Sequence, residues 1–156
     1  MTGRLDTIQA AVLNVKMKYF ADVVAKREAI GAKYSQLLAG ANVVTPVIAP
    51  GNTHVYAQYT LKVARRDEVV KALRERGIPC GVYYPTPCHL QPCFAKYGFK
   101  AGDFPVSELL GQQVVSLPMH PYLTDELLQH ITAQVKEAVA AVGADSSSVV
   151  AGDASA

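Results

Sequence analysis

The sequence lacks a long apolar run. None of its stretches approaches the roughly 20 consecutive apolar residues that a membrane helix needs. The amino terminus also lacks the apolar segment of a signal peptide, because residues 1–6 lead straight into a helical pattern. From these two absences we expect a cytoplasmic protein that has no membrane partner.

Excess charge of one sign is also missing. Lysine and arginine together number 15, aspartate and glutamate 13, and the formal net charge is +2 without a large basic block. A protein that binds nucleic acid through its phosphates carries a clustered basic surface, so we expect no nucleic-acid partner. Half of the 156 residues are hydrophobic and 18% are charged, which is typical of one globular domain.

Cysteine is scarce as well. The chain has Cys80, Cys88 and Cys93, and an odd number in a chain of this size argues against a disulfide framework. His89 follows Cys88 directly, which raises the question of zinc. The spacing lacks a paired Cys-x-x-Cys, and no second cluster supplies the missing ligands. We expect free thiols and no metal site.

The first element is predicted to be a long helix over residues 6–39. Asp6 and Gln9 have the spacing of a capping box, and Gly40 stands where a left-handed terminator belongs. Apolar residues follow a helical stripe at Ile8, Val12, Val15, Tyr19, Val23, Ile30, Tyr34 and Leu37. Unbroken, it would be about 50 Å long, so we expect it to run along a second domain or a partner chain unless Gly31 kinks it.

The remaining chain alternates between strands and helices. Strands are predicted over residues 43–48 (an edge strand or extended segment), 55–63, 78–84 and 114–117, and helices over residues 67–76, 104–110 and 124–143. We therefore expect an α/β protein of the α+β type, with a small, mostly antiparallel sheet and helices on one face. We place the domain at residues 1–143 and predict that the small and polar residues 144–156 form a disordered tail.

Four segments in a fixed order resemble one family. They are residues 3–11 (GRLDTIQAA), residues 77–79 with 83–92 (GIP and YYPTPCHLQP), residues 104–108 (FPVSE) and residues 116–121 (SLPMHP). Together they are similar to the carboxy-terminal part of the DegT/DnrJ/StrS sugar aminotransferases. The resemblance implies the small domain of a fold-type I aminotransferase, which begins with an interdomain helix. Two positions depart from the family pattern: Thr2 replaces an asparagine, and Tyr83 replaces the histidine of a His-Tyr-Pro motif.

The resemblance also implies a reaction and its cofactor. Such enzymes make amino sugars from nucleotide-linked keto sugars, usually with glutamate as the donor, and they work as dimers. Their pyridoxal phosphate is held as a Schiff base by a lysine that precedes the segment beginning at Gly3. We therefore expect no catalytic residue in this chain and no cofactor bound to this chain alone. Its partner would be a second copy or an amino-terminal cofactor domain.

Four residues are candidates for substrate binding: Arg4, Tyr83, Tyr84 and His89. The Arg4 guanidinium suits an anionic sugar nucleotide, although the alternative is an exposed arginine beside a helix start. Strand alternation would place one of Tyr83 and Tyr84 in the core and offer the other phenol to a sugar, unless both only pack. His89 either donates a hydrogen bond near the substrate or ties its loop to backbone carbonyls.

The function that we expect is the small-domain portion of a nucleotide-sugar aminotransferase, inactive by itself. It would supply a wall of the substrate site and part of the dimer contact. The alternatives are a free-standing, non-catalytic interaction module and one half of a split enzyme.

Overall fold

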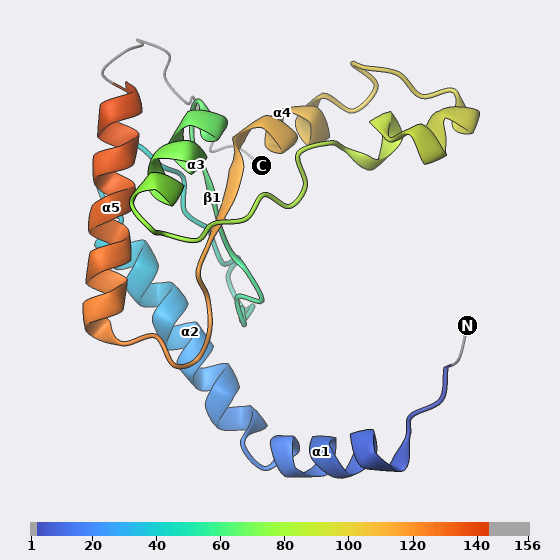
Figure 1. Ribbon diagram of the computed structural model, residues 1–156, viewed down its shortest axis with the longest axis vertical. Coiled ribbons are helices and arrows are strands. Elements are labelled where there is room, and N and C mark those ends of the chain that lie inside the picture. The colour runs from blue at the N-terminus through green and yellow to red at the C-terminus, as the bar shows by residue number, and fades with distance from the viewer. Residues whose placement is uncertain (1–2, 144–156) are drawn as a thin grey trace.

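The structure is a computed structural model that describes residues 3–143. The elements run α1 (Thr7–Met17), α2 (Phe20–Leu37), β1 (Tyr59–Lys62), α3 (Arg66–Glu75), η1 (Cys88–Leu90), η2 (Pro92–Tyr97), α4 (Pro105–Gln113), β2 (Val114–Leu117) and α5 (Asp125–Gly143) (Figure 1). The predicted tail over residues 144–156 lies outside the described residues.

The sheet is small and antiparallel, as predicted. β1 pairs with β2 in a register that sets Tyr59 opposite Leu117 and Lys62 opposite Val114. An isolated bridge from Val44 flanks β1, and one from Gly81 flanks β2. The strands predicted over residues 43–48 and 78–84 are thus reduced to single bridges, because each contains proline, which cannot donate to a ladder.

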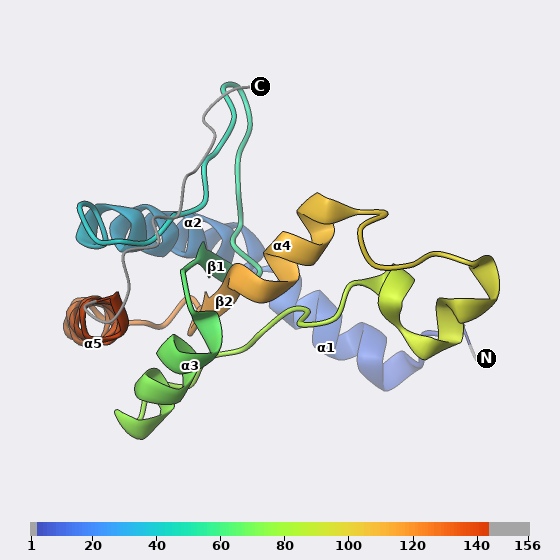
Figure 2. The same cartoon turned by 90° about the horizontal axis from the view of Figure 1, so that it is seen from above.

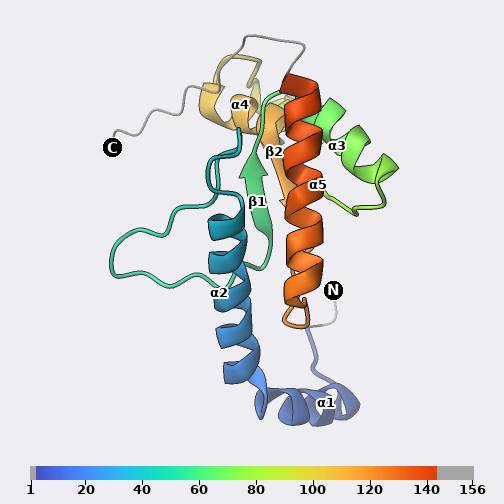
Figure 3. The same cartoon turned by 90° about the vertical axis from the view of Figure 1, so that its left-hand side faces the viewer.

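Helices α2 and α5 pack side by side against the sheet, and α3 packs against α5 (Figures 2 and 3). The core between them is made of large side chains that are almost fully buried, among them Tyr34, Leu38, Tyr59, Leu61, Leu73, Val115, Leu128 and Val135. The rings of Tyr34 and Tyr59 stack with centroids 4.7 Å apart and join α2 to β1. Burying each such apolar side chain contributes about 1.5–3 kcal/mol, so this core holds the two helices and the sheet together.

The long helix is interrupted, contrary to the prediction. α1 ends at Met17 and α2 begins at Phe20, whereas Gly31 lies inside α2. The intervening segment contains no glycine or proline. It is closed by tight i→i+3 bonds, in which the N–H groups of Lys18 and Tyr19 donate to carbonyls three residues back. α1 buries no residue whereas α2 packs on the core, so tertiary packing fixes only the direction of α2.

The strand predicted over residues 55–63 forms only in its second half. Tyr59 and Leu61 are buried on one face of β1, whereas Val55 and Ala57, which regular strand alternation would place on the same face, are exposed and Tyr56 is buried instead. Tyr56 has a φ of 44°, in the left-handed region, which few residues with a Cβ adopt. This residue reverses the alternation, and β1 therefore begins only at Tyr59.

Two segments project from the body of the molecule. Residues 45–57 form an excursion between α2 and β1, and residues 85–104, here called the arm, include η1 and η2 (Figure 2). The arm and α1 both extend away from α5, toward the same side (Figure 1). Within residues 3–143, no helix combines the length and the apolar character that crossing a membrane requires.

Candidate functional site

The tyrosine pair lies on the surface where the chain leaves the sheet. After the bridge at Gly81 the backbone turns away, and the side chains of Tyr83 and Tyr84 are 48% and 71% exposed. Their rings meet edge to face, with centroids 5.8 Å apart. The expectation that one of them belongs to the core is therefore wrong, because the strand that would have set their alternation ends before them. Both phenols are available to a ligand.

A cavity of about 440 Å³ opens beside Tyr83. Its walls include Gln58 before β1, Gly81 and Tyr83 beyond the second bridge, and Ser116 and Met119 at the end of β2. No ionisable side chain other than Tyr83 and Cys80 lines it. The amide of Gln58 and the phenol of Tyr83 can exchange hydrogen bonds with ligand hydroxyls, whereas the hydroxyl of the buried Ser116 is already bonded to Thr60 at 2.8 Å. The lining therefore suits an uncharged, hydroxyl-bearing group better than a phosphate or a carboxylate.

A second cavity, of about 240 Å³, is lined by both tyrosines together with Ser107 and Gly111 of α4. Here α4 passes very close to the loop: a Cβ on Gly111 would lie 3.0 Å from the carbonyl oxygen of Pro85. Glycine at this position allows that approach. Tyr83 therefore lines both cavities, and Tyr84 lines the second.

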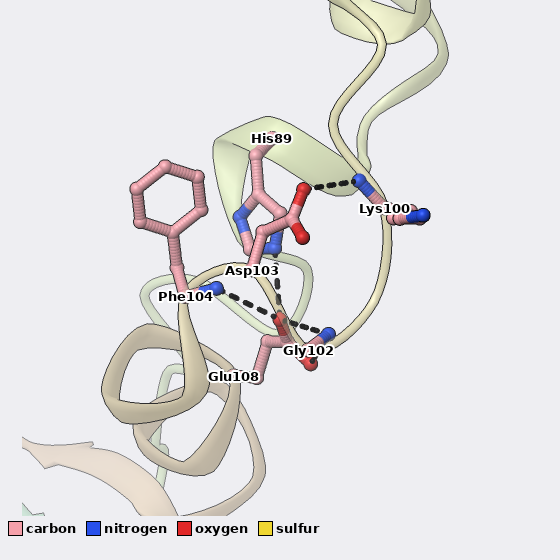
Figure 4. A network of polar contacts seen from close by, with 6 residues as sticks. All are labelled: His89, Lys100, Gly102, Asp103, Phe104 and Glu108. Carbon is pink, nitrogen blue, oxygen red and sulfur yellow. Dashed lines mark hydrogen bonds and ion pairs between the residues drawn. The ribbon is translucent and has the colours of Figure 1, made fainter.

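His89 and Glu108 form the centre of a polar network at the base of the arm (Figure 4). The His89 side chain is only 8% exposed, and its Nε2 lies 3.0 Å from Oε1 of Glu108. Glu108 also accepts the N–H groups of Gly102 at 2.9 Å and Phe104 at 3.4 Å. The Gly102 N–H and then His89 lower the pKa of the Glu108 carboxyl. In this geometry His89 ties its loop to a carboxylate rather than to backbone carbonyls.

Aromatic packing reinforces this network. The Phe104 ring contacts the His89 imidazole at a centroid distance of 4.8 Å and the Phe99 ring at 5.3 Å. Asp103 accepts the N–H of Lys100 at 2.9 Å, which closes the turn before Phe104 (Figure 4). Sequence reasoning missed Glu108. The available signal was its place in the first turn of a helix, where a carboxylate accepts preceding N–H groups.

Arg4 is not joined to these residues. It is exposed in the extended segment before α1, and within residues 3–143 it makes no hydrogen bond or ion pair. The structure thus brings Tyr83 and Tyr84 together, places His89 in the adjoining arm, and leaves Arg4 apart.

No lysine in the described part of the chain is suited to hold pyridoxal phosphate covalently. Such a lysine must be neutral to attack, which requires desolvation or a neighbouring cation. Every lysine of residues 3–143 is exposed or half-buried. The hydrogen bond to Asp22 raises the pKa of Lys26, and Lys33 pairs with Asp125 at 2.5 Å. The residues present therefore do not fit the covalent attachment of this cofactor.

Metal ligands are not gathered either. Over the described range, no group of three or more His, Cys, Asp or Glu side chains is arranged to hold an ion. Cys80 is half-buried, Cys88 and Cys93 are exposed, and all three thiols are free.

Comparison with known proteins gives a consistent result. The profile of the DegT/DnrJ/EryC1/StrS aminotransferase family matches residues 1–136. A pleiotropic regulatory protein of Geobacillus stearothermophilus is 42% identical over 86% of this chain and 37% of its own length. The UDP-2-acetamido-2-deoxy-3-oxo-D-glucuronate aminotransferase of Pseudomonas aeruginosa is 39% identical over 85% of this chain and 36% of its own.

A solved aminotransferase structure has a similar fold in its matching part. The crystal structure of S. venezuelae DesV superposes with a TM-score of 0.83 at 36% identity, covering 86% of this chain and 36% of that one. The chain thus spans little more than a third of the length of the proteins that it matches.

Proposed function

This chain belongs to the DegT/DnrJ/EryC1/StrS aminotransferase family, and on that premise we propose that it is the small-domain portion of an aminotransferase acting on a nucleotide-linked keto sugar. Members of the family bind pyridoxal phosphate, which accepts and returns the amino group. In this proposal the chain supplies a wall of the sugar site and part of a subunit contact. It has no cofactor attachment of its own.

The observation that carries the proposal is the uncharged cavity beside Tyr83. A hexose presents hydroxyl groups and no charge, and the Gln58 amide and the Tyr83 phenol are groups that bind hydroxyls. Tyr84, which faces the second cavity, extends the same wall. The diphosphate of the substrate needs cations, and none lines either cavity. Its binding groups therefore belong to the cofactor domain, to a partner subunit, or to Arg4 brought in by assembly.

Assembly is the second part of the proposal. α1 presents Ile8, Val12 and Val15 to solvent, and the arm presents Phe94 and Tyr97. Leaving side chains of this size in water forgoes about 1.5–3 kcal/mol each. We propose that an amino-terminal cofactor domain and a second subunit cover these surfaces in the functional enzyme.

The rival function is a non-catalytic interaction module, or one half of a split enzyme. It is favoured by one comparison, since the relative from Geobacillus stearothermophilus is described as a pleiotropic regulatory protein. A regulator would use the same exposed surfaces of α1 and the arm but would not need the cavity beside Tyr83.

A chimera tests the proposal. Residues 3–143 would replace the matching carboxy-terminal part of the dTDP-3-amino-3,4,6-trideoxy-alpha-D-glucose transaminase of Streptomyces venezuelae, a 36% identical relative whose sugar has no carboxylate, and amino transfer from glutamate to its keto sugar would be measured. The control is the same chimera with Gln58→Leu and Tyr83→Phe. We expect transfer in the first chimera and a loss of at least about tenfold in the control, because two ligand hydrogen bonds are removed. A folded, cofactor-loaded chimera that transfers nothing would refute the proposal and favour the interaction module.

A further inference from the structure

The side chain of Arg27 binds four backbone carbonyls, two of them in residues that line the first cavity. Its Nε donates to the carbonyl of Val55 at 2.9 Å, and its two Nη atoms donate to the carbonyls of Tyr56, of Ala57 at 3.0 Å and of Met119 at 3.4 Å. No carboxylate pairs with this guanidinium among the described residues. Arg27 is therefore engaged with main chain alone.

The four carbonyls belong to two segments that are far apart in the sequence. Three are consecutive and lie where the excursion over residues 45–57 returns to β1, and the fourth lies just after β2. Neither segment is in the sheet at these points, so no ladder bond fixes their separation. A guanidinium offers five N–H donors in a rigid plane, which allows one side chain to set the spacing between the two segments.

Two further residues on the same face of α2 assist. Tyr34 donates its hydroxyl to the carbonyl of Pro118 at 2.9 Å. Gly31 leaves room for the ring of Tyr56, since a Cβ at this position would lie 2.3 Å from Tyr56 Cδ2. The spacing of Arg27, Gly31 and Tyr34 is i, i+4 and i+7, which aligns them along one helix face. Through this face, α2 contacts both segments.

The same two segments form facing walls of the cavity beside Tyr83. Ala57 and Gln58 line one wall, and Pro118 and Met119 line another. Arg27 thus binds the main chain of a residue in each wall and is not itself among the residues that line the cavity. The Gln58 amide follows directly after the Ala57 carbonyl that Arg27 binds.

We propose that Arg27 is a positioning residue, which holds the two walls of the sugar cavity at the spacing that the ligand requires without touching the ligand. The inference rests on the proposed function only in taking this cavity for the sugar wall. Without the guanidinium, the carbonyls lose charge-assisted donors and the walls separate, while the core between α2, α5 and the sheet remains.

Cys80 reports on this cavity because it lines it and is half-buried. The experiment measures alkylation of each cysteine by iodoacetamide under native conditions, by mass spectrometry, in the full chain and in Arg27→Met and Arg27→Lys. We expect Cys80 to react about tenfold faster in Arg27→Met, because the cavity walls that shield its thiol separate more often. In Arg27→Lys we expect an intermediate rate, because the single ammonium group restores part of the contacts to the carbonyls. The exposed Cys88 and Cys93 should react at unchanged rates.

Leu128→Ala is the matched control for a general loss of stability. Leu128 is buried in the core on α5 and does not line the cavity. Urea unfolding of both variants at several temperatures would identify a temperature at which their free energies of unfolding are equal. The alkylation rates of Cys80 are then compared at that temperature. An equal Cys80 rate in both variants, or an unchanged rate in Arg27→Met, would overturn the proposal. The measurement requires neither cofactor nor sugar, so its outcome is independent of whether the chimera transfers an amino group.

Discussion

His89 Nε2 lies 3.0 Å from Glu108 Oε1, and this contact joins the first part of the arm to α4, the helix that follows the arm. Because Glu108 also accepts the N–H groups of Gly102 and Phe104, one carboxylate holds both ends of residues 89–104. The arm packs little against the rest of the molecule, because η1 and η2 bury no residue within the described chain. Its order therefore depends on Glu108.

Replacing Glu108 by glutamine should loosen the arm. Glutamine keeps the oxygen that His89, Gly102 and Phe104 share, but it lacks the negative charge that strengthens these bonds, and its NH2 group would face the Gly102 N–H where Oε2 now accepts at 3.1 Å. We expect trypsin to cleave after Lys96 and Lys100, both exposed in the arm, roughly fivefold faster or more. Glu137→Gln on α5, which removes only a 4.0 Å ion pair with Arg76, is the control. Equal cleavage of the two variants would contradict the assignment.

The same contact predicts a dependence on acid. The folded state lowers the pKa of Glu108, chiefly through the N–H of Gly102. A lowered pKa means that the stabilisation is fully present above the ordinary glutamate pKa of about 4.3 and is lost as the pH falls through the folded value. We expect the amide nitrogen shift of Gly102 to change with a midpoint below pH 4.3. A midpoint above that value would show that the carboxylate is not held in its ionised form.

Gly31→Ala should destabilise the fold. The new methyl group would collide with the ring of Tyr56 at 2.3 Å, and overpacking of this kind costs about 1–3 kcal/mol in the free energy of unfolding. Gly143→Ala is the matched control, because a Cβ at that helical position meets nothing within 4 Å. Urea denaturation of both variants would measure the difference. A Gly31→Ala variant as stable as Gly143→Ala would mean that Tyr56 does not rest on α2.

The exposed face of α1 should make the chain associate. Ile8 is 80% exposed, and Val12 and Val15 are also more than half exposed. A symmetric pairing of two α1 helices would cover both apolar faces at once. We expect concentration-dependent dimers or higher oligomers in sedimentation experiments and a shift toward the monomer in Ile8→Glu with Val12→Glu. Val47→Glu, at an exposed valine outside α1, should leave association unchanged, and a chain that is monomeric at all concentrations would refute the prediction.

The chain alone should not take up pyridoxal phosphate at a unique lysine. The reason is that no lysine of residues 3–143 is buried, whereas a lysine that forms a Schiff base needs desolvation or a neighbouring cation. Incubation with the cofactor, reduction with borohydride and mass spectrometry would reveal any adduct. Scattered substoichiometric labelling is expected. One lysine modified in full would show that the chain contains an attachment site of its own.

Elements with strong local signals could be predicted within a few residues. The sequence predicts helices over residues 67–76, 104–110 and 124–143, and α3, α4 and α5 occupy Arg66–Glu75, Pro105–Gln113 and Asp125–Gly143. It predicts β2 at its observed bounds, Val114–Leu117. Each carries its own start or stop signal, such as the Thr124 hydroxyl that accepts the N–H of Leu127. Signals of this kind act over three or four residues and can be seen in the sequence.

The missed features are those that depend on contacts across the chain. The break at Lys18 and Tyr19 has no local breaker, and the reversal at Tyr56 fits a ring onto Gly31, far back in the sequence. The partners of Arg27 and Glu108 are mostly backbone groups, and backbone groups leave no trace in a pattern of side chains.

The sequence alone therefore determined the family, the helix-and-sheet class and the tyrosine pair, because these rest on short motifs and on periodicity. Only the tertiary structure decided that both tyrosines are exposed and that Tyr83 lines two cavities, that His89 pairs with Glu108, and that Arg27 binds a residue in each of two cavity walls. The physical reason is that a cavity forms between segments that are brought together by burial of a shared core. The distance between these segments cannot be read from the sequence of any one of them.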